Sequence, residues 1–170
     1  FKKKPQVFRN TELIYSNKVA EYAKKLGFKA ILSEGWEKYL NWRSPNFLYK
    51  AKPSILGSFN EKMLISKRFR EEINQDIFLL LKNYKLSDDI AFRFSNKKWT
   101  SYPLTAEKYA NWLQKAPGET INLFMDYETF GEHQWEDSGI FKFLEKLPEE
   151  LKKRNIGFRT PSETINQLSV

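Results

Sequence analysis

Short apolar segments alternate along this chain with stretches in which apolar residues recur three and four positions apart. The second pattern predicts amphipathic helices, and it occurs at 19–26, 73–81, 106–113 and 140–151. The first is typical of short strands with both faces buried, and it occurs at 7–12, 29–33, 89–95 and, most clearly, 120–127. Repeated strand and helix units predict a parallel α/β fold.

Turn and capping residues predict where several of these elements begin and end. Gly27 should end the first helix, whose expected core face is Val19, Tyr22, Ala23 and Leu26. Thr105 should cap the helix at 106–113. Thr160-Pro161-Ser162-Glu163 predicts another helix start, with Thr at the N-cap, Pro at the first position and Glu at the third.

The remaining stretches have weaker patterns. Residues 35–62 are rich in Trp, Asn, Pro and Ser, which predicts a long loop with at most one short strand at 47–50. Residues 157–159 suggest a weak last strand. No glycine-rich phosphate-binding motif occurs.

Composition excludes several classes of protein. The chain has 170 residues, of which 41% are hydrophobic and 16% aromatic, so it is not intrinsically disordered. It has no Cys, which excludes disulfides, thiol nucleophiles and Cys-ligated metals, and its single His cannot form a His-rich metal site. We expect one domain over residues 1–170, with no metal and no organic cofactor.

Charge changes the picture little. The net charge is +8, with basic residues concentrated in the first half and acidic residues around 126–137. A basic, aromatic chain could bind nucleic acid, but lysines spread along helices are more typical of solvated surfaces, so we expect no nucleic-acid partner. No apolar run approaches the roughly 20 residues of a membrane span, and no signal sequence is evident. We expect a cytoplasmic protein that does not contact a membrane.

Two carboxylates follow predicted strands. Glu12 follows the strand near Val7, and Asp126 ends the strand at 120–127. Working residues of parallel α/β folds lie at the C-terminal ends of strands. Two carboxylates are the minimum for glycoside hydrolysis, one as nucleophile or base and one as acid. Carboxylates at strand ends can equally cap the next helix or pair with arginine, and this pattern alone leaves both readings open.

Several motifs resemble glycoside hydrolase family 57, most closely its α-amylase-like branch. Residues 7–13 (VFRNTEL) and 124–133 (FMDYETFGEH) resemble two characteristic segments of that family. Three shorter stretches also resemble it: 42–45 (WRSP), 86–95 (LSDDIAFRFS) and 160–163 (TPSE). The resemblance extends from Pro5 to about Glu163, and the two long motifs are the specific ones.

The resemblance implies a mechanism and a fold. Glu12 matches the family's nucleophile and Asp126 its general acid/base in a retaining reaction, for which the carboxyl groups should lie about 5–5.5 Å apart. The implied substrates are α-1,4-glucans, and no cofactor is implied. The implied fold is a partial (β/α)7 TIM-like barrel with parallel strands.

Polar residues beside the two carboxylates are candidates for substrate binding. Arg9 could hold Glu12 ionised. Glu128 could orient a sugar hydroxyl or tune Asp126. His133 could hydrogen-bond sugar or simply pack the loop after the strand, and metal binding is the weaker alternative.

Aromatic residues in expected loops are further candidates. Trp36, Trp42 and Trp135 could stack on glucose rings if their indoles are exposed. Trp99 and Trp112 lie beside or within a predicted helix and are expected in the core.

The sequence departs from the family pattern at its start. Family members begin with a strand carrying a His-Gln-Pro-type motif, followed by a segment that contains a second glutamate, and neither occurs here. We therefore expect the chain to begin just before the nucleophile strand, with the N-terminal strands of the barrel missing. A 4-α-glucanotransferase or branching enzyme, or a carbohydrate-binding fragment without turnover, remains an alternative, and the oligomeric state is open.

Overall fold

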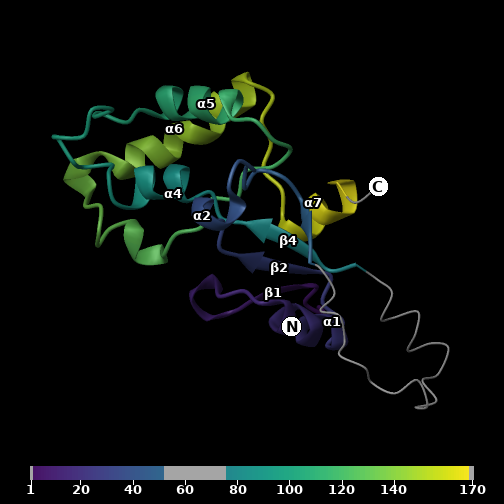
Figure 1. Ribbon diagram of the computed structural model, residues 1–170. Helices are drawn as coiled ribbons and strands as arrows, with labels where there is room; N and C mark the ends of the chain where they lie inside the picture. The colour runs from purple at the N-terminus through teal and green to yellow at the C-terminus, as the bar shows by residue number, and fades with distance from the viewer. Residues whose placement is uncertain (1, 52–75, 169–170) are drawn as a thin grey trace, which may run out of the picture. The chain divides into compact units, whose positions relative to one another are not determined.

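The protein is described by a computed structural model over residues 2–51 and 76–168 (Figure 1). Within these residues the fold is mixed α/β, with a four-stranded, mostly parallel sheet and six α-helices. The chain divides into two compact units. Of the described residues, the first comprises 2–34, 47–51, 76–81 and 159–168, and the second comprises 35–46 and 82–158. Each has its own hydrophobic core.

The first unit is built on the sheet, whose strand order is β1-β2-β4-β3. Strands β1 (Val7–Arg9), β2 (Ala30–Ser33) and β4 (Phe78–Leu81) are parallel neighbours, and β3 (Tyr49–Lys50) pairs antiparallel with β4. Helix α1 (Asn17–Lys25) forms the crossover that the parallel pairing of β1 and β2 requires.

Helix α7 (Pro161–Leu168) completes the core of the first unit, where its Ile165 packs with Ala30 and Leu80. Its predicted start is confirmed. The Thr160 N–H donates to Glu163 Oε2 at 2.7 Å, and the Glu163 N–H donates to the Thr160 hydroxyl at 3.3 Å. These two hydrogen bonds form a capping box. The Thr160 hydroxyl also donates to Glu163 Oε2, and the two donors of Thr160 hold the pKa of Glu163 below its ordinary value.

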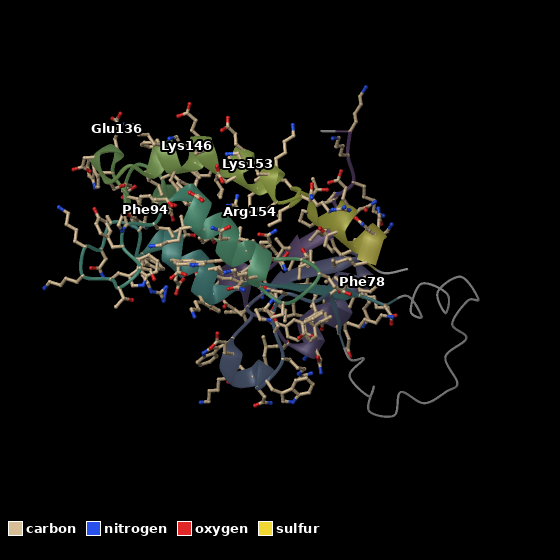
Figure 2. All side chains as sticks on the ribbon, turned by 90° about the horizontal axis from the view of Figure 1, so that it is seen from above. Phe78, Phe94, Glu136, Lys146, Lys153 and Arg154 are labelled. Carbon is tan, nitrogen blue, oxygen red and sulfur yellow. The ribbon has the colours of Figure 1, made fainter. Side chains whose placement is uncertain are left out.

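The second unit is helical. Its helices are α2 (Glu37–Leu40), α4 (Tyr84–Ala91), α5 (Ala106–Lys115) and α6 (Ile140–Lys153), with short 3-10 turns η2 (Tyr127–Thr129) and η3 (Glu136–Ser138). The core lies among α4, α5 and α6. Phe94, labelled in Figure 2, packs edge-to-face on Phe143, with the two ring centroids 5.1 Å apart. Burial of each such ring contributes about 1.5–3 kcal/mol to the free energy of folding.

Tyr109 connects two helices of this core. Its ring is fully buried and its hydroxyl donates to the Leu86 carbonyl of α4 at 2.8 Å. Burial raises the pKa of Tyr109, and the nearby charge of Asp89 raises it further, so the hydroxyl stays a neutral donor.

Three sequence predictions hold for the helices of the second unit. Thr105 caps α5 by accepting from the Lys108 N–H at 3.2 Å, and the apolar face of α5 is buried as expected. The periodic residues of α6 are buried, except for Leu144, which is partly exposed. Trp99 and Trp112 pack against the core.

Two predicted element types are wrong. Residues 78–81 form strand β4 rather than the end of a helix, because four consecutive apolar residues suit either state and pairing with β2 decides the outcome. Ile73 lies outside the described residues. Residues 84–91 form helix α4 rather than a strand at 89–95. Asn83 nucleates this helix by accepting from the Leu86 N–H at 3.0 Å.

The predicted strands at 120–127 and 157–159 are wrong, and the predicted loop at 35–62 is only partly right. Segment 120–127 joins no ladder among the described residues, where a single parallel bridge links Asn122 to Lys82. Residues 157–159 are irregular. Strand β3 confirms the short strand at 47–50, but the expected loop also contains α2, and residues 52–62 lie outside the described ranges.

The predicted core face of α1 is also partly wrong. Ala20 and Ala23 are buried, whereas Tyr22 and Leu26 are exposed.

In the described ranges, no helix is both long and apolar enough to cross a bilayer.

Gly118 should be difficult to replace. Its φ is +136°, and a Cβ there would lie 2.3 Å from the Asn46 carbonyl oxygen. We predict that Gly118→Ala lowers the free energy of unfolding by about 3 kcal/mol, through backbone strain and overlap with Asn46. Gly139→Ala is the control, because Gly139 also has positive φ (+84°) but open space around it. That change should cost only about 1 kcal/mol. Equal losses in urea unfolding would contradict the role of the Asn46 contact.

Candidate active site

Glu12 lies three residues after the end of strand β1, in the strained 3-10 turn η1 (Thr11–Leu13). Its backbone is left-handed (φ 52°, ψ 22°), and the following Leu13 also has positive φ (57°). Residues without a glycine's freedom rarely adopt this conformation, and such strain gathers at functional positions. The side chain of Glu12 is exposed.

Neighbouring contacts hold this turn in place. Leu13 is buried, its N–H donates to the Asn10 carbonyl at 3.1 Å, and its carbonyl accepts from the Glu34 N–H at 3.2 Å. The Asn10 side-chain amide donates to the Ile14 carbonyl at 3.1 Å. The buried leucine and the asparagine therefore close the turn around the exposed carboxylate.

Arg9, the last residue of β1, is exposed. In residues 2–51, where both side chains are described, no ion pair joins Arg9 to Glu12.

Asp126 lies at the start of the turn η2, in the second unit, and is exposed. Its carbonyl accepts from the Thr129 N–H at 3.1 Å. The carbonyl of Glu128 accepts from the N–H groups of His133 at 2.9 Å and Glu132 at 3.2 Å. The backbone thus folds into a compact loop on which the side chains of Asp126, Glu128 and His133 are all exposed.

The candidate tryptophans are open to solvent. Trp42 is 90% exposed and Trp135 is 66% exposed. Trp36 is 53% exposed and meets Tyr39 edge-to-face at 5.1 Å. Indoles with this much free surface can stack on a sugar ring.

The structure distributes the predicted residues between the two units. Arg9 and Glu12 belong to the first unit. The second unit holds Trp42, Asp126, Glu128, His133 and Trp135, of which the last four lie on one loop. Among the described residues, no group of three or more His, Asp or Glu side chains is placed to hold a metal ion.

Comparison with known proteins identifies the family of this chain. The model of glycosyl hydrolase family 57 matches residues 1–170. The chain belongs to this family. A relative from Methanocaldococcus jannaschii, named "Putative alpha-amylase", is 50% identical over 166 residues, covering 97% of this chain and 31% of the relative. The family 57 chain thus spans less than a third of that protein.

Sequence reasoning missed the asparagines that organise this family 57 chain beside its Asp126 loop. Asn46 is buried, its side-chain amide donates to the Pro117 carbonyl at 3.1 Å, and its own carbonyl accepts from the Glu119 N–H at 2.8 Å. The Asn83 amide donates to Asn46 Oδ1 at 2.9 Å. Asn46 directly follows the motif at 42–45, and that position is the signal that could have revealed it.

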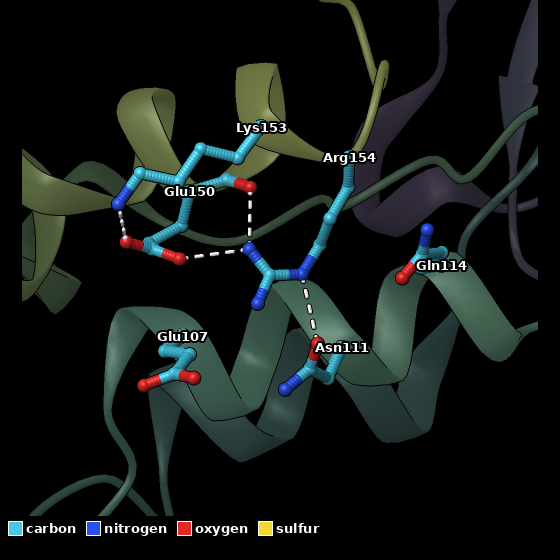
Figure 3. Close-up of a pocket in the computed structure, with 6 residues that line it drawn as sticks. All are labelled: Glu107, Asn111, Gln114, Glu150, Lys153 and Arg154. Carbon is cyan, nitrogen blue, oxygen red and sulfur yellow. Dashed lines mark hydrogen bonds and ion pairs between the residues drawn. The ribbon is translucent and has the colours of Figure 1, made fainter.

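The described residues of the family 57 chain also form a polar pocket that none of these residues lines (Figure 3). It has a volume of about 500 Å³ between α5 and α6, and its lining is Glu107, Asn111, Gln114, Glu150, Lys153 and Arg154. Glu150 binds Lys153 at 2.6 Å and Arg154 at 2.7 Å, and these hydrogen bonds lower the pKa of Glu150. The charges of Glu150, Lys153 and Arg154 therefore satisfy one another, and no aromatic side chain lines the pocket as a platform for a sugar.

The strain at Glu12 predicts a difference between two substitutions that both remove its carboxylate. Glu12→Gly should leave the protein about 1 kcal/mol more stable than Glu12→Ala, because only glycine adopts positive φ without a Cβ penalty. Thermal unfolding of the two variants measures this difference. Equal stability would show that the left-handed turn is relaxed in solution.

Proposed function

We propose that this chain carries both catalytic carboxylates of a retaining glycoside hydrolase that acts on α-1,4-glucans. Glu12 is the nucleophile and Asp126 is the general acid/base. The observation that carries the proposal is the left-handed backbone conformation of Glu12, shortly after the C-terminal end of a parallel strand. A strained residue that exposes a carboxylate at such a place is typical of a functional site. Family membership and the name of the M. jannaschii relative support the same reaction class.

The proposed reaction has two steps. Glu12 attacks the anomeric carbon and forms a covalent glucosyl ester while Asp126 gives its proton to the departing glycosidic oxygen. Asp126, now a carboxylate, removes a proton from water, which displaces Glu12 and releases the sugar with its original configuration. Glu12 must start ionised and Asp126 protonated, and neither step needs a metal.

The remaining candidates would bind the glucan. Trp42 and Trp135 offer exposed indoles for stacking, and Glu128, His133 and Arg9 offer hydrogen bonds to sugar hydroxyls. Sugar rings have apolar faces and polar edges, and a mixture of aromatic and charged side chains matches both.

We further propose that residues 1–170 belong to one catalytic domain with an incomplete (β/α)7 barrel. The parallel order β1-β2-β4 supports this proposal, as does the crossover through α1. The parallel bridge between Lys82 and Asn122 is also of the type that barrel strands form.

Removal of each carboxylate should give a distinct result in the full-length protein. We predict that Glu12→Gln and Asp126→Asn each lower kcat on maltooligosaccharides by about 10²–10⁴-fold. Azide should restore turnover of an activated α-glucoside by Asp126→Ala and give an α-glucosyl azide, because the covalent intermediate still forms on Glu12.

Glu132→Gln is the matched control, since Glu132 is an exposed carboxylate on the same loop as Asp126. It should retain near-normal activity. Full activity of Glu12→Gln would overturn the assignment of the nucleophile.

Product analysis decides between hydrolysis and transfer. With maltoheptaose as the only sugar, a hydrolase should give products no longer than seven glucose units. Longer linear products would identify a 4-α-glucanotransferase, and new branch points would identify a branching enzyme. Binding of amylose without any turnover would identify a carbohydrate-binding role.

A further inference from the structure

One stripe of helix α4 faces the segment that leads to Asp126. Asn83, Ser87 and Ala91 are spaced four residues apart, so they lie along one side of the helix. The Asn83 N–H donates to the Asn122 carbonyl at 2.9 Å, and the Ser87 hydroxyl oxygen accepts from the Phe124 N–H at 3.2 Å. The first bond belongs to the parallel bridge between Lys82 and Asn122, and the second takes the place of a ladder partner that an ordinary strand would have.

Ala91, the third residue of the stripe, is bonded to the part of the loop that follows Asp126. The Gln134 side-chain amide donates to the Ala91 carbonyl at 2.9 Å. Ala91 is the last residue of α4, so its carbonyl has no partner within the helix and needs an external donor. Gln134 provides that donor from 43 positions further along the chain.

Burial makes both contacts strong. Ser87 is fully buried and Gln134 is 3% exposed, so water does not compete for these hydrogen bonds. Asp126, by contrast, is exposed. It lies two residues after Phe124 and eight before Gln134, and its carboxylate therefore projects from a span that the same helix holds on both sides.

We propose that Ser87 and Gln134 are positioning residues for Asp126. They fix the backbone on either side of the carboxyl group, so that the group meets the glycosidic oxygen in the geometry that proton transfer requires. This inference rests on the proposed function of Asp126. It assigns a task to the motif at 86–95, whose residues take no part in the proposed chemistry.

A comparison of two substrates isolates this task. The value of kcat/KM reports the first step, in which the bond from Glu12 to C1 forms, the bond from C1 to the leaving group breaks, and the proton of Asp126 moves to the leaving oxygen. With α-maltosyl fluoride the leaving group departs as fluoride and needs no proton. A misplaced general acid should therefore lower kcat/KM on maltooligosaccharides and leave kcat/KM on α-maltosyl fluoride unchanged.

The variants Ser87→Ala and Gln134→Met remove one hydrogen bond each from the full-length protein. We expect each to lower kcat/KM on maltoheptaose by about tenfold or more, since small displacements of a catalytic group have effects of this size. On α-maltosyl fluoride the loss should stay within about twofold. If Gln134→Met fails to fold, Gln134→Glu serves instead. Its carboxyl group can donate to Ala91 only when protonated, so its selective loss on maltoheptaose should grow as pH rises.

Tyr109→Phe is the matched control. It also removes a buried hydrogen bond to α4, donated to Leu86, but no described hydrogen bond or ring contact of Tyr109 involves a residue of segment 120–135. It should lower the melting temperature as Ser87→Ala does, and any change in kcat/KM should be equal for the two substrates. The inference is overturned if Ser87→Ala and Gln134→Met lower kcat/KM equally on the two substrates, or if they lower kcat/KM on neither substrate.

Asp126→Ala separates this inference from the proposed function. It should lose maltoheptaose activity and keep the first step on α-maltosyl fluoride. If Asp126→Ala lowers kcat/KM equally on both substrates, Asp126 is not the general acid, and the proposed function is wrong together with this inference. If Asp126→Ala discriminates while the Ser87 and Gln134 variants do not, only the positioning roles fail.

Discussion

The second unit depends on one constraint, which is that the backbone of segment 117–135 must find hydrogen-bond partners without a sheet. Buried N–H and carbonyl groups cannot remain unpaired at low cost. Here Asn46 donates to the Pro117 carbonyl at the start of the segment, and Ser87 accepts from the Phe124 N–H in its middle. Gln134 ties the end of the segment to helix α4 by donating to the Ala91 carbonyl. A ladder partner accommodates many side chains, but a hydroxyl or an amide at a fixed position does not. The loop of Asp126 is therefore tied to particular residues in a way that an ordinary strand is not.

These polar contacts need a rigid base, and the core of the second unit provides it. Helix α4 places its polar stripe toward the loop, while Leu86 and Ile90 pack into the cluster formed with α5 and α6. Tyr109 adds a buried hydrogen bond to the Leu86 carbonyl. The asparagine that begins α4 also pairs with Asn122, so the start of the helix and the position of the loop are determined together. Stability and site geometry are thus coupled through one short helix.

The sequence predicted the elements whose signals are local. Thr105 and Glu163 mark helix starts by capping chemistry, and the periodicity of α6 is long enough to be unambiguous. It failed where the deciding partner is distant. The apolar run at 78–81 becomes a strand only because β2 lies beside it, and segment 120–127 is not a regular strand because side chains take the place of ladder partners. The same limit applies to the site. Glu12 and Asp126 could be selected from strand ends and motifs, whereas Ser87 and Gln134 act through contacts that periodicity cannot reveal.

The two candidate carboxylates are held by different physical means. Glu12 is presented by backbone conformation, since its left-handed turn is closed by the buried Leu13 and by the Asn10 side chain. Asp126 is presented by two hydrogen bonds to helix α4, one from the Phe124 N–H before it to the Ser87 hydroxyl and one from the Gln134 side chain after it to the Ala91 carbonyl. A strained turn stores energy and allows few alternatives at one residue, which suits a nucleophile that must reach a single carbon. A loop anchored at two separated points holds the backbone on both sides of the residue between them, which suits a group that must meet first a leaving oxygen and then a water molecule in the geometry that proton transfer requires. The difference in anchoring therefore follows the difference in the chemistry proposed for the two residues.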